Sequence, residues 1–373
     1  MGKFRARRAI AAAAVALAAV LGAGGWAADT QQAVTGPPPG SAAWTADTAL
    51  GLRLPDPAAT TPAEVAAFFN RLTPAQREAL AVRHPLVVGN LDGTPVQLRY
   101  HANTLALAEE RDREAARAAD PALTPQDQAA ARTRAERYRT LLDGGRQVLA
   151  FDPRGRGQVA EVFGDLAAAR RTAVVVPGSD IDLLSFDRAA DPYGTPAGMA
   201  RSLYEATGRT TAVIAWAGYT TPVRVGLDAA TEDLAGAGAA RLTRLLDGLA
   251  ASTRPEAPAT VFCHSYGSVV CGLARPGPAQ ASAVVVLGSP GMGVASAADL
   301  DPRVPLWATA RNGSDWIGRV PNVSLFGLGH GADPTGPDFG ARPLPSTGSH
   351  GHTGYFAPGT ASLTAYAALA QGR

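Results

Sequence analysis

The fold is decided by residues 261–270, which read VFCHSYGSVV. Apolar residues precede the polar pair His264-Ser265, and the apolar run resumes after Gly267. This order predicts a buried strand, a tight turn at Ser265 and a helix, with Gly267 small enough for the helix and the strand to approach closely. Such a turn, a nucleophile elbow, lifts a serine hydroxyl off the carboxyl end of a sheet. Cys263 replaces the first glycine of the pattern Gly-x-Ser-x-Gly, which weakens the motif without removing it. The other interpretation is that Ser265 only caps a helix.

Short apolar runs alternate with helical segments on both sides of this stretch. The candidate strands are rich in β-branched residues and bounded by Gly, Pro or Asp, at 147–151, 173–176, 212–216, 260–263, 283–287 and 306–309. The helices expected between them include 196–207 and 229–252. Buried strands separated by helices predict an α/β fold with a mostly parallel sheet. In such a sheet the functional loops follow the carboxyl ends of the strands.

A nucleophilic Ser265 needs a histidine base, and the base needs a carboxylate that orients it. We expect the base to be His352, in a Gly-flanked loop ahead of a C-terminal helix. His350 is the second candidate, His330 reads as a residue that stabilises its loop, and His264 should point away from the nucleophile. In hydrolases built on such an elbow, the nucleophilic serine comes first along the chain, the acid second and the histidine third.

Asp315 is the first carboxylate beyond the candidate strand 306–309, so we expect it to be the acid. Asp333 is the competing candidate for the acid. Asp301 lies before that strand. The alternative for Asp315 is a helix cap of residues 316–319. The oxyanion of acyl transfer needs two backbone N–H donors. We expect these from Tyr266, which follows the nucleophile, and from Ser179 in the turn after strand 173–176, with Gly178 as the substitute.

The chain begins with a basic cluster, MGKFRARR, and an Ala-rich apolar run. Residues 1–28 are therefore predicted to be a signal peptide or an N-terminal membrane anchor, with cleavage favoured because alanine is a weak anchor. Residues 29–48 contain GPPPG and are predicted to be a flexible tether. Residues 49–145 form an N-terminal helical segment that could be a lid or plain packing, and residues 146–373 form the catalytic domain. Two helices are expected to begin after the caps Thr61 and Thr73.

Composition limits the remaining choices. Of 373 residues, 46% are hydrophobic and 18% charged, so a core can form and a disordered chain is excluded. The net charge of +2 leaves no basic excess for a nucleic-acid partner. With two cysteines and no phosphate-binding glycine loop, we expect no metal and no cofactor. Cys263 and Cys271 are expected to be buried free thiols, because a partner for Cys271 should lie nearer Val261, although export favours pairing.

Several stretches of the sequence resemble those of a secreted actinobacterial α/β-hydrolase family once catalogued only as a domain of unknown function. The matching stretches are LTPAQR (72–77), VGNLDG (88–93), VPG (176–178), HSYGS (264–268), GSPG (288–291), HGADP (330–334) and GH (351–352). The resemblance implies an α/β-hydrolase fold with a mostly parallel central sheet flanked by helices and an N-terminal helical segment. It also implies export and a Ser-His-Asp site, and no known substrate.

Three functions follow as hypotheses. The first is an exported serine hydrolase, secreted or at the cell surface, that cleaves a carboxylic ester of a small-molecule or lipid acyl substrate. The second is acyl transfer to a wall or lipid acceptor by the same residues. The third is a non-catalytic surface or binding protein on a hydrolase scaffold, for which Cys263 is the main support.

Overall fold

The computed structural model describes residues 30–253, 255–325 and 327–373. The predicted signal peptide or anchor, residues 1–28, lies outside them. The centre of the molecule is an eight-stranded sheet in the order β1-β2-β4-β3-β5-β6-β8-β10. Within it β2 runs antiparallel to its neighbours β1 and β4, and the other pairs are parallel. The strands are β1 Gln147–Asp152, β2 Gln158–Phe163, β3 Thr172–Val176, β4 Ala212–Ala217, β5 Ala259–His264, β6 Ala281–Leu287, β8 Leu306–Thr309 and β10 Arg342–Leu344.

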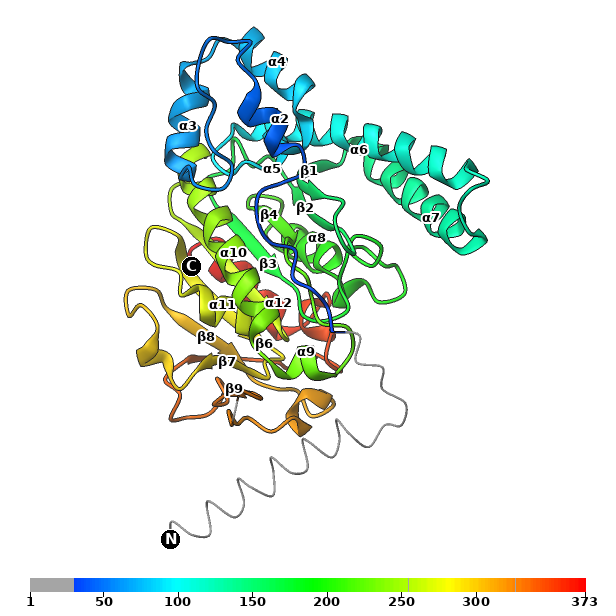
Figure 1. Cartoon of the computed structure of the whole chain (residues 1–373). Coiled ribbons are helices and arrows are strands. Elements are labelled where there is room, and N and C mark those ends of the chain that lie inside the picture. Colours follow the sequence, from blue (N-terminus) through cyan, green and yellow to red (C-terminus); the bar gives the residue numbers. More distant parts are fainter. Residues whose placement is uncertain (1–29, 254, 326) are drawn as a thin grey trace.

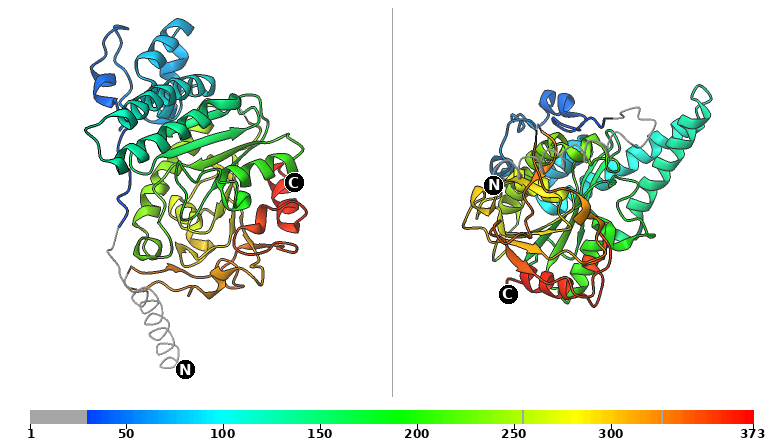
Figure 2. Two further views of the ribbon diagram at one scale, coloured as in Figure 1. Left: turned by 90° about the vertical axis from the view of Figure 1, so that its right-hand side faces the viewer. Right: turned by 90° about the horizontal axis from the view of Figure 1, so that it is seen from below.

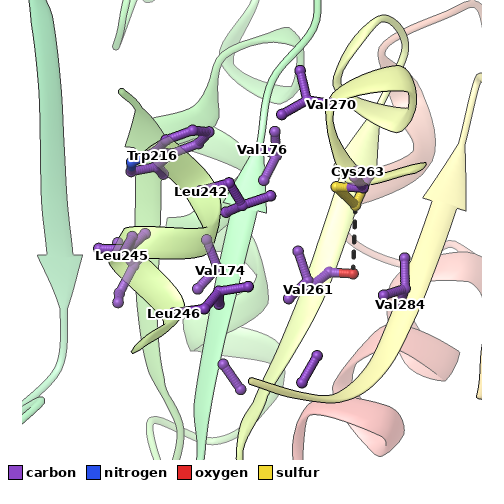
Figure 3. Packing of buried hydrophobic residues seen from close by; sticks show 14 of the residues in the cluster. Val174, Val176, Trp216, Leu242, Leu245, Leu246, Val261, Cys263, Val270 and Val284 are labelled. Carbon is purple, nitrogen blue, oxygen red and sulfur yellow. Dashed lines mark hydrogen bonds between the residues drawn. A yellow bond between two sulfur atoms is a disulfide. The ribbon is translucent and has the colours of Figure 1, made fainter. Parts of the chain in front are cut away.

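Helices cover both faces of this sheet (Figure 1). Helices α10 Asp233–Ser252 and α11 Gly267–Ala274 pack on one face, and α8 Pro196–Ala206 and α12 Ala361–Ala370 pack on the other. Alternate residues of β3 and β5 enter the two cores, so residues 173–176 and 261–263 are apolar on both faces of the sheet. Figure 3 shows the α10 side, where Val174 and Val176 of β3 lie beside Leu242 and Leu246. The predicted α/β layers are confirmed.

The N-terminal helical segment forms a third core of its own. Its helices are α3 Pro62–Arg71, α4 Pro74–Arg83, α5 Pro85–Asn90, α6 Val96–Ala119 and α7 Pro125–Leu142, and α2 Ser41–Ala46, which precedes the segment, adds Trp44 to this core. Thr61 and Thr73 cap α3 and α4 as predicted, each in a capping box with the residue three positions later. Helices α6 and α7 pair in a long hairpin that extends beyond the rest of the molecule (Figure 2).

Residues 30–48 correct the prediction of a flexible tether. The backbone N–H of Gln31 donates to Asp228 Oδ2 at 2.6 Å, and that of Val34 donates to Thr220 Oγ1 at 3.0 Å. Trp44 in α2 is fully buried, and its indole N–H donates to Pro55 O at 2.7 Å. Glycine and proline exclude a long helix here, but they do not prevent the segment from packing along the domain (Figure 1).

Helix α7 of the helical segment contacts the loop after β3. Arg137 of α7 donates to Leu183 O at 2.7 Å and pairs with Asp187 at 2.8 Å, both in the loop after β3. In the described ranges, no hydrogen bond or ion pair joins the segment to Ser265, Asp315 or His352. None of the helices in the same ranges is long and apolar enough to span a membrane.

Candidate active site

Ser265 stands at a strained turn between β5 and α11. Its φ is +54°, in the left-handed region, which costs a non-glycine residue about 1 kcal/mol or more. The Ser265 N–H donates to Leu287 O of the neighbouring strand β6 at 3.0 Å, which holds the turn against the sheet. A β-carbon placed on Gly267 would lie 2.6 Å from the carbonyl oxygens of both Val176 and Pro177, so this position needs glycine. The geometry is that of the predicted elbow.

Asp315 and His352 meet at Gly288, the residue after Leu287, whose carbonyl accepts the Ser265 N–H: a β-carbon on Gly288 would lie 3.0 Å from His352 Cε1 and 3.5 Å from Asp315 Oδ2. Asp315 follows β8 and begins the 3₁₀ helix η4 Trp316–Arg319. Its Oδ1 accepts hydrogen bonds from His352 Nδ1 at 2.8 Å and from the Ile317 N–H at 2.9 Å. Its Oδ2 accepts the Tyr355 hydroxyl at 2.6 Å. The two interpretations of Asp315, helix cap and histidine partner, therefore hold at the same time.

The charge of this carboxylate fixes the histidine tautomer. Burial alone would raise the pKa of Asp315, but the hydrogen bonds from His352, Tyr355 and Ile317 hold it below its usual range. An ionised carboxylate only accepts, so Nδ1 of His352 carries the ring proton and Nε2 is left unprotonated. Nε2 is buried, and it has no hydrogen-bond partner within the ranges described.

Two rings hold His352 in place. His264 lies on one side with its ring centroid 4.7 Å away, and Trp316 lies 4.6 Å away. His264 Nε2 also donates to the backbone carbonyl of His352 at 2.9 Å. Burial lowers the pKa of His264 to about 3, so its ring is neutral at ordinary pH. His264 was expected to point away from the nucleophile. Its ring contacts His352, through a long-range contact that the sequence does not reveal.

The competing residues lie elsewhere. His350 is exposed, and His330 Nε2 donates to Ala229 O at 2.7 Å in a buried loop, as its predicted stabilising role requires. Asp333 pairs with Arg311 at 2.9 Å and accepts from the Thr335 N–H at 2.9 Å.

The loop after β3 approaches the elbow at Gly178. A β-carbon on Gly178 would lie 2.6 Å from Ser265 Cβ and 3.1 Å from the Tyr266 backbone nitrogen. The preceding carbonyl, Pro177 O, accepts the hydroxyl of the buried Tyr219 at 2.7 Å. Across the described part of the chain, no acceptor bonds the N–H of Tyr266 or of Ser179. Both predicted oxyanion donors are therefore near the elbow with their amides unused.

Cys263 and Cys271 form a disulfide, which corrects the prediction of free thiols. Their Cα atoms are 6.4 Å apart, within the range that a disulfide spans. The prediction counted one helical turn beyond Gly267, away from Cys263. The turn at Ser265 instead folds α11 back over the end of β5, so Cys271 faces Cys263 in the core.

The sheet, its helical layers and this elbow define an α/β-hydrolase fold. A family model described as Alpha/beta hydrolase matches residues 152–325, just under half of the chain. The match includes Ser265 and Asp315 and ends before His352.

The chain is similar to two proteins of Mycobacterium tuberculosis, from strains H37Rv and CDC 1551, both named only as uncharacterized. Each is 28% identical over 393 aligned positions, which include 86% of this chain and 57% of the relative. The chain thus spans little more than half the length of the curated relatives it matches.

Among solved structures, esterase 2 of Thermogutta terrifontis phosphonylated by cyclosarin has a TM-score of 0.35 at 12% identity, covering 61% of this chain and 92% of that one. The propionate-bound form has a TM-score of 0.34 at 12% identity, covering 58% and 88%. At TM-scores this low, the likeness says nothing about the chemistry of this chain.

Proposed function

We propose that the protein is a serine hydrolase of carboxylic esters. The observation that carries the proposal is the hydrogen bond from His352 Nδ1 to Asp315, next to a serine held at a strained elbow. Ser265 Oγ attacks the acyl carbonyl, and His352 Nε2 takes its proton and passes it to the leaving alcohol. Asp315 stabilises the imidazolium, and the amides of Tyr266 and Ser179 donate to the oxyanion. Water then cleaves the acyl-enzyme by the same route.

Exposed apolar side chains on η4 and on the loops after β3 and β4 support an acyl group as the substrate. Trp316, which packs on His352, is 41% exposed. Leu184, Val223 and Val225 are also exposed, on the loops after β3 and β4. These two loops are joined by the Asp180 N–H, which donates to Pro222 O at 2.8 Å. Exposed apolar side chains that gather beside a site favour an apolar ligand.

Turnover of p-nitrophenyl esters of graded acyl length tests the proposal. The wild-type protein should hydrolyse them, and Ser265→Ala should abolish hydrolysis while keeping the melting temperature, because a hydroxyl at a turn contributes little to packing. His352→Ala should be nearly as damaging and His350→Ala far less so. Near-normal turnover by Ser265→Ala would remove Ser265 from the mechanism.

Two further measurements separate the alternatives. A fluorophosphonate probe should label Ser265 if the site is catalytic, and a binding protein on a hydrolase scaffold would not react. Added alcohols should leave the products of the wild-type enzyme as free acids, whereas an acyltransferase would form new esters.

We also propose that the protein is exported, to be secreted or held at the cell surface. The basic start and apolar run of residues 1–28 are typical of an export signal. The disulfide between Cys263 and Cys271 supports this, because disulfides persist in oxidising compartments. Amino-terminal sequencing of protein recovered from outside the cell should find a start near Asp29, whereas cytoplasmic recovery of the intact chain would contradict the proposal.

A further inference from the structure

A cavity lies apart from Ser265, Asp315 and His352. Its volume is about 290 Å³, and it is enclosed by the N-terminal segment, β1, β2 and α10. Trp216 at the end of β4 and Leu245 of α10 form part of an apolar wall (Figure 3). Pro37 and Pro38, which precede α2, also line the cavity. None of the three proposed catalytic residues is among the residues that line it.

Four arginines line this cavity, and two of them are neutralised. Arg99 pairs with Asp92 at 3.0 Å, and Arg154 pairs with Asp152 at 2.6 Å. The other two, Arg241 and Arg244, have no carboxylate within 4.0 Å in the described ranges.

The uncompensated pair lies on α10. Arg241 Nε donates to Gly218 O at 2.5 Å, and an Arg244 terminal nitrogen donates to Thr60 O at 3.2 Å. Residues three apart on a helix are neighbours, so the two guanidinium groups lie on one face. Burial lowers the pKa of Arg241, although Asp152 and Asp92, which pair with the other two arginines, act on it in the opposite direction from beyond 4.0 Å. The cavity wall therefore carries two positive charges that the protein does not balance.

Gln158 adds an unused amide to the same wall. It begins β2, lines the cavity and is only 3% exposed. Neither its amide nitrogen nor its amide oxygen has a hydrogen-bond partner in the described part of the molecule. A buried amide without partners destabilises the folded state, so such groups are normally satisfied. An unsatisfied amide beside two unpaired guanidinium groups indicates a site that its ligand completes.

We propose that this cavity binds an organic anion, with a carboxylate or phosphate head group and an apolar body. Arg241 and Arg244 pair with the head group, because guanidinium groups bind planar anions with paired hydrogen bonds. Gln158 donates a further hydrogen bond, and the body of the ligand packs on Trp216. The volume suits a compact ligand, such as a bicyclic aromatic or a short acyl chain.

Calorimetric titration of the full chain tests the proposal, with 2-naphthoate and 2-naphthyl phosphate as anionic probes and 2-naphthamide as the matched neutral probe. Ser265→Ala is used as the background, so that binding is separated from turnover. Both anions should bind at least tenfold more tightly than the amide, and the tighter anion identifies the head group. Equal binding of the amide and both anions would overturn the proposal.

Variants locate the binding. Arg244→Met should weaken the anions at least tenfold, Gln158→Met should weaken them several-fold, and Arg244→Lys should retain most of the affinity. Arg241→Met should abolish binding, with its melting temperature measured to show that it folds. If it does not fold, the partly exposed Arg244 and its two variants carry the test. Unchanged affinity in Arg244→Met and Gln158→Met would place the anion elsewhere and refute the site, whether or not the protein hydrolyses esters.

Discussion

Asp315 accepts hydrogen bonds from three donors that come from different parts of the chain. The Ile317 N–H is local, whereas His352 and Tyr355 follow β10. The local bond from the Ile317 N–H orients the carboxylate independently of His352. The Tyr355 hydroxyl then occupies the second oxygen, so that Asp315 can turn only Oδ1 toward the ring. The orientation of the base thus depends on a fully buried tyrosine that the sequence does not single out.

Asp315→Asn should lower kcat by about 10³- to 10⁴-fold with little change in KM, because an amide favours the wrong tautomer of His352. Tyr355→Phe should lower kcat several-fold, since the carboxylate stays charged but is less firmly oriented. Asp333→Asn is the control, and it should affect the melting temperature rather than turnover. If Asp333→Asn lost turnover at an unchanged melting temperature while Asp315→Asn kept it, the acid would be Asp333.

Gly178→Ala should lower kcat at least tenfold. The new methyl group would lie 2.9 Å from Ser265 Oγ and 3.1 Å from the Tyr266 nitrogen, so the nucleophile or the oxyanion donors must move. Gly236→Ala in α10 is the matched control, because a β-carbon there meets no atom within 4 Å in the described structure. Steady-state kinetics of both variants check the prediction, and equal activity would show that the loop after β3 does not adjoin the reacting groups.

Among the elements, the strands that were predicted are those whose side chains are apolar on both faces. All six candidate strands are present, with ends that differ by at most two residues. β2 was missed because Glu161 interrupts its apolar pattern. In the structure Glu161 is buried and pairs with Arg146, which lies 15 residues earlier in the chain. This ion pair compensates the buried charge.

The site shows the same division between local and distant information. Ser265 and Tyr266 could be predicted because the elbow is a local pattern of strand, turn and helix. Asp315 and His352 required the order of strands and a guess about which loops meet. The contacts of His264 and Tyr355 depend on packing between segments far apart in the chain, and no local pattern reports them. The disulfide was missed for the related reason that the path of α11 over β5 is set by the whole layer.

The disulfide ties α11 to β5 next to the nucleophile, so its removal should lower stability. Closing a loop of 8 residues restricts the unfolded chain by about 2.5 kcal/mol in the chain-entropy account. The free energy of unfolding of Cys263→Ala/Cys271→Ala, measured in urea, should therefore be lower than that of the wild type by about 2–3 kcal/mol. A reductant should destabilise the wild type and leave the double variant unchanged. An unchanged free energy of unfolding would mean that the core gains nothing from the bond.

At the scale of the whole molecule, buried histidines make folding sensitive to acid. Burial lowers the pKa of His264 to about 3 and also lowers the pKa of His330, whereas histidine in the unfolded chain has a pKa of about 6.5. At a pH between the folded and unfolded pKa values, these histidines bind a proton in the unfolded chain and not in the folded chain. Stability is thus complete above about pH 6.5 and is lost as the pH falls toward the folded pKa.

Carboxylates act in a lower range and can be separated from this effect. The pKa of Asp47 is lowered to about 2, chiefly by hydrogen bonds from the Ala49 N–H and from His84, and that of Asp301 is lowered to about 2 by Arg303. Their contribution to stability is present above pH 4 and is lost as the pH falls through 2. Burial raises the pKa of Glu110 and of Glu232, and these groups act with the opposite sign, so the contribution of one histidine between pH 6.5 and 4.5 is obtained from the difference between the wild type and its variant.

His264→Gln should flatten the loss of stability in that interval. Each histidine that is buried and neutral adds a slope of about 1.4 kcal/mol per pH unit to the free energy of unfolding, and glutamine has no proton to gain. The glutamine amide can still donate to the His352 carbonyl, so the loop keeps its contact. Urea unfolding at pH 6.5, 5.5 and 4.5 should show a slope reduced by up to this amount, with the remainder due to His330. His101→Gln, at an exposed histidine that pairs with Glu78, is the control variant for the same substitution outside the core. An equal slope in wild type and His264→Gln would mean that His264 takes up its proton in the folded state, and its ring could not then hold His352 as a neutral neighbour.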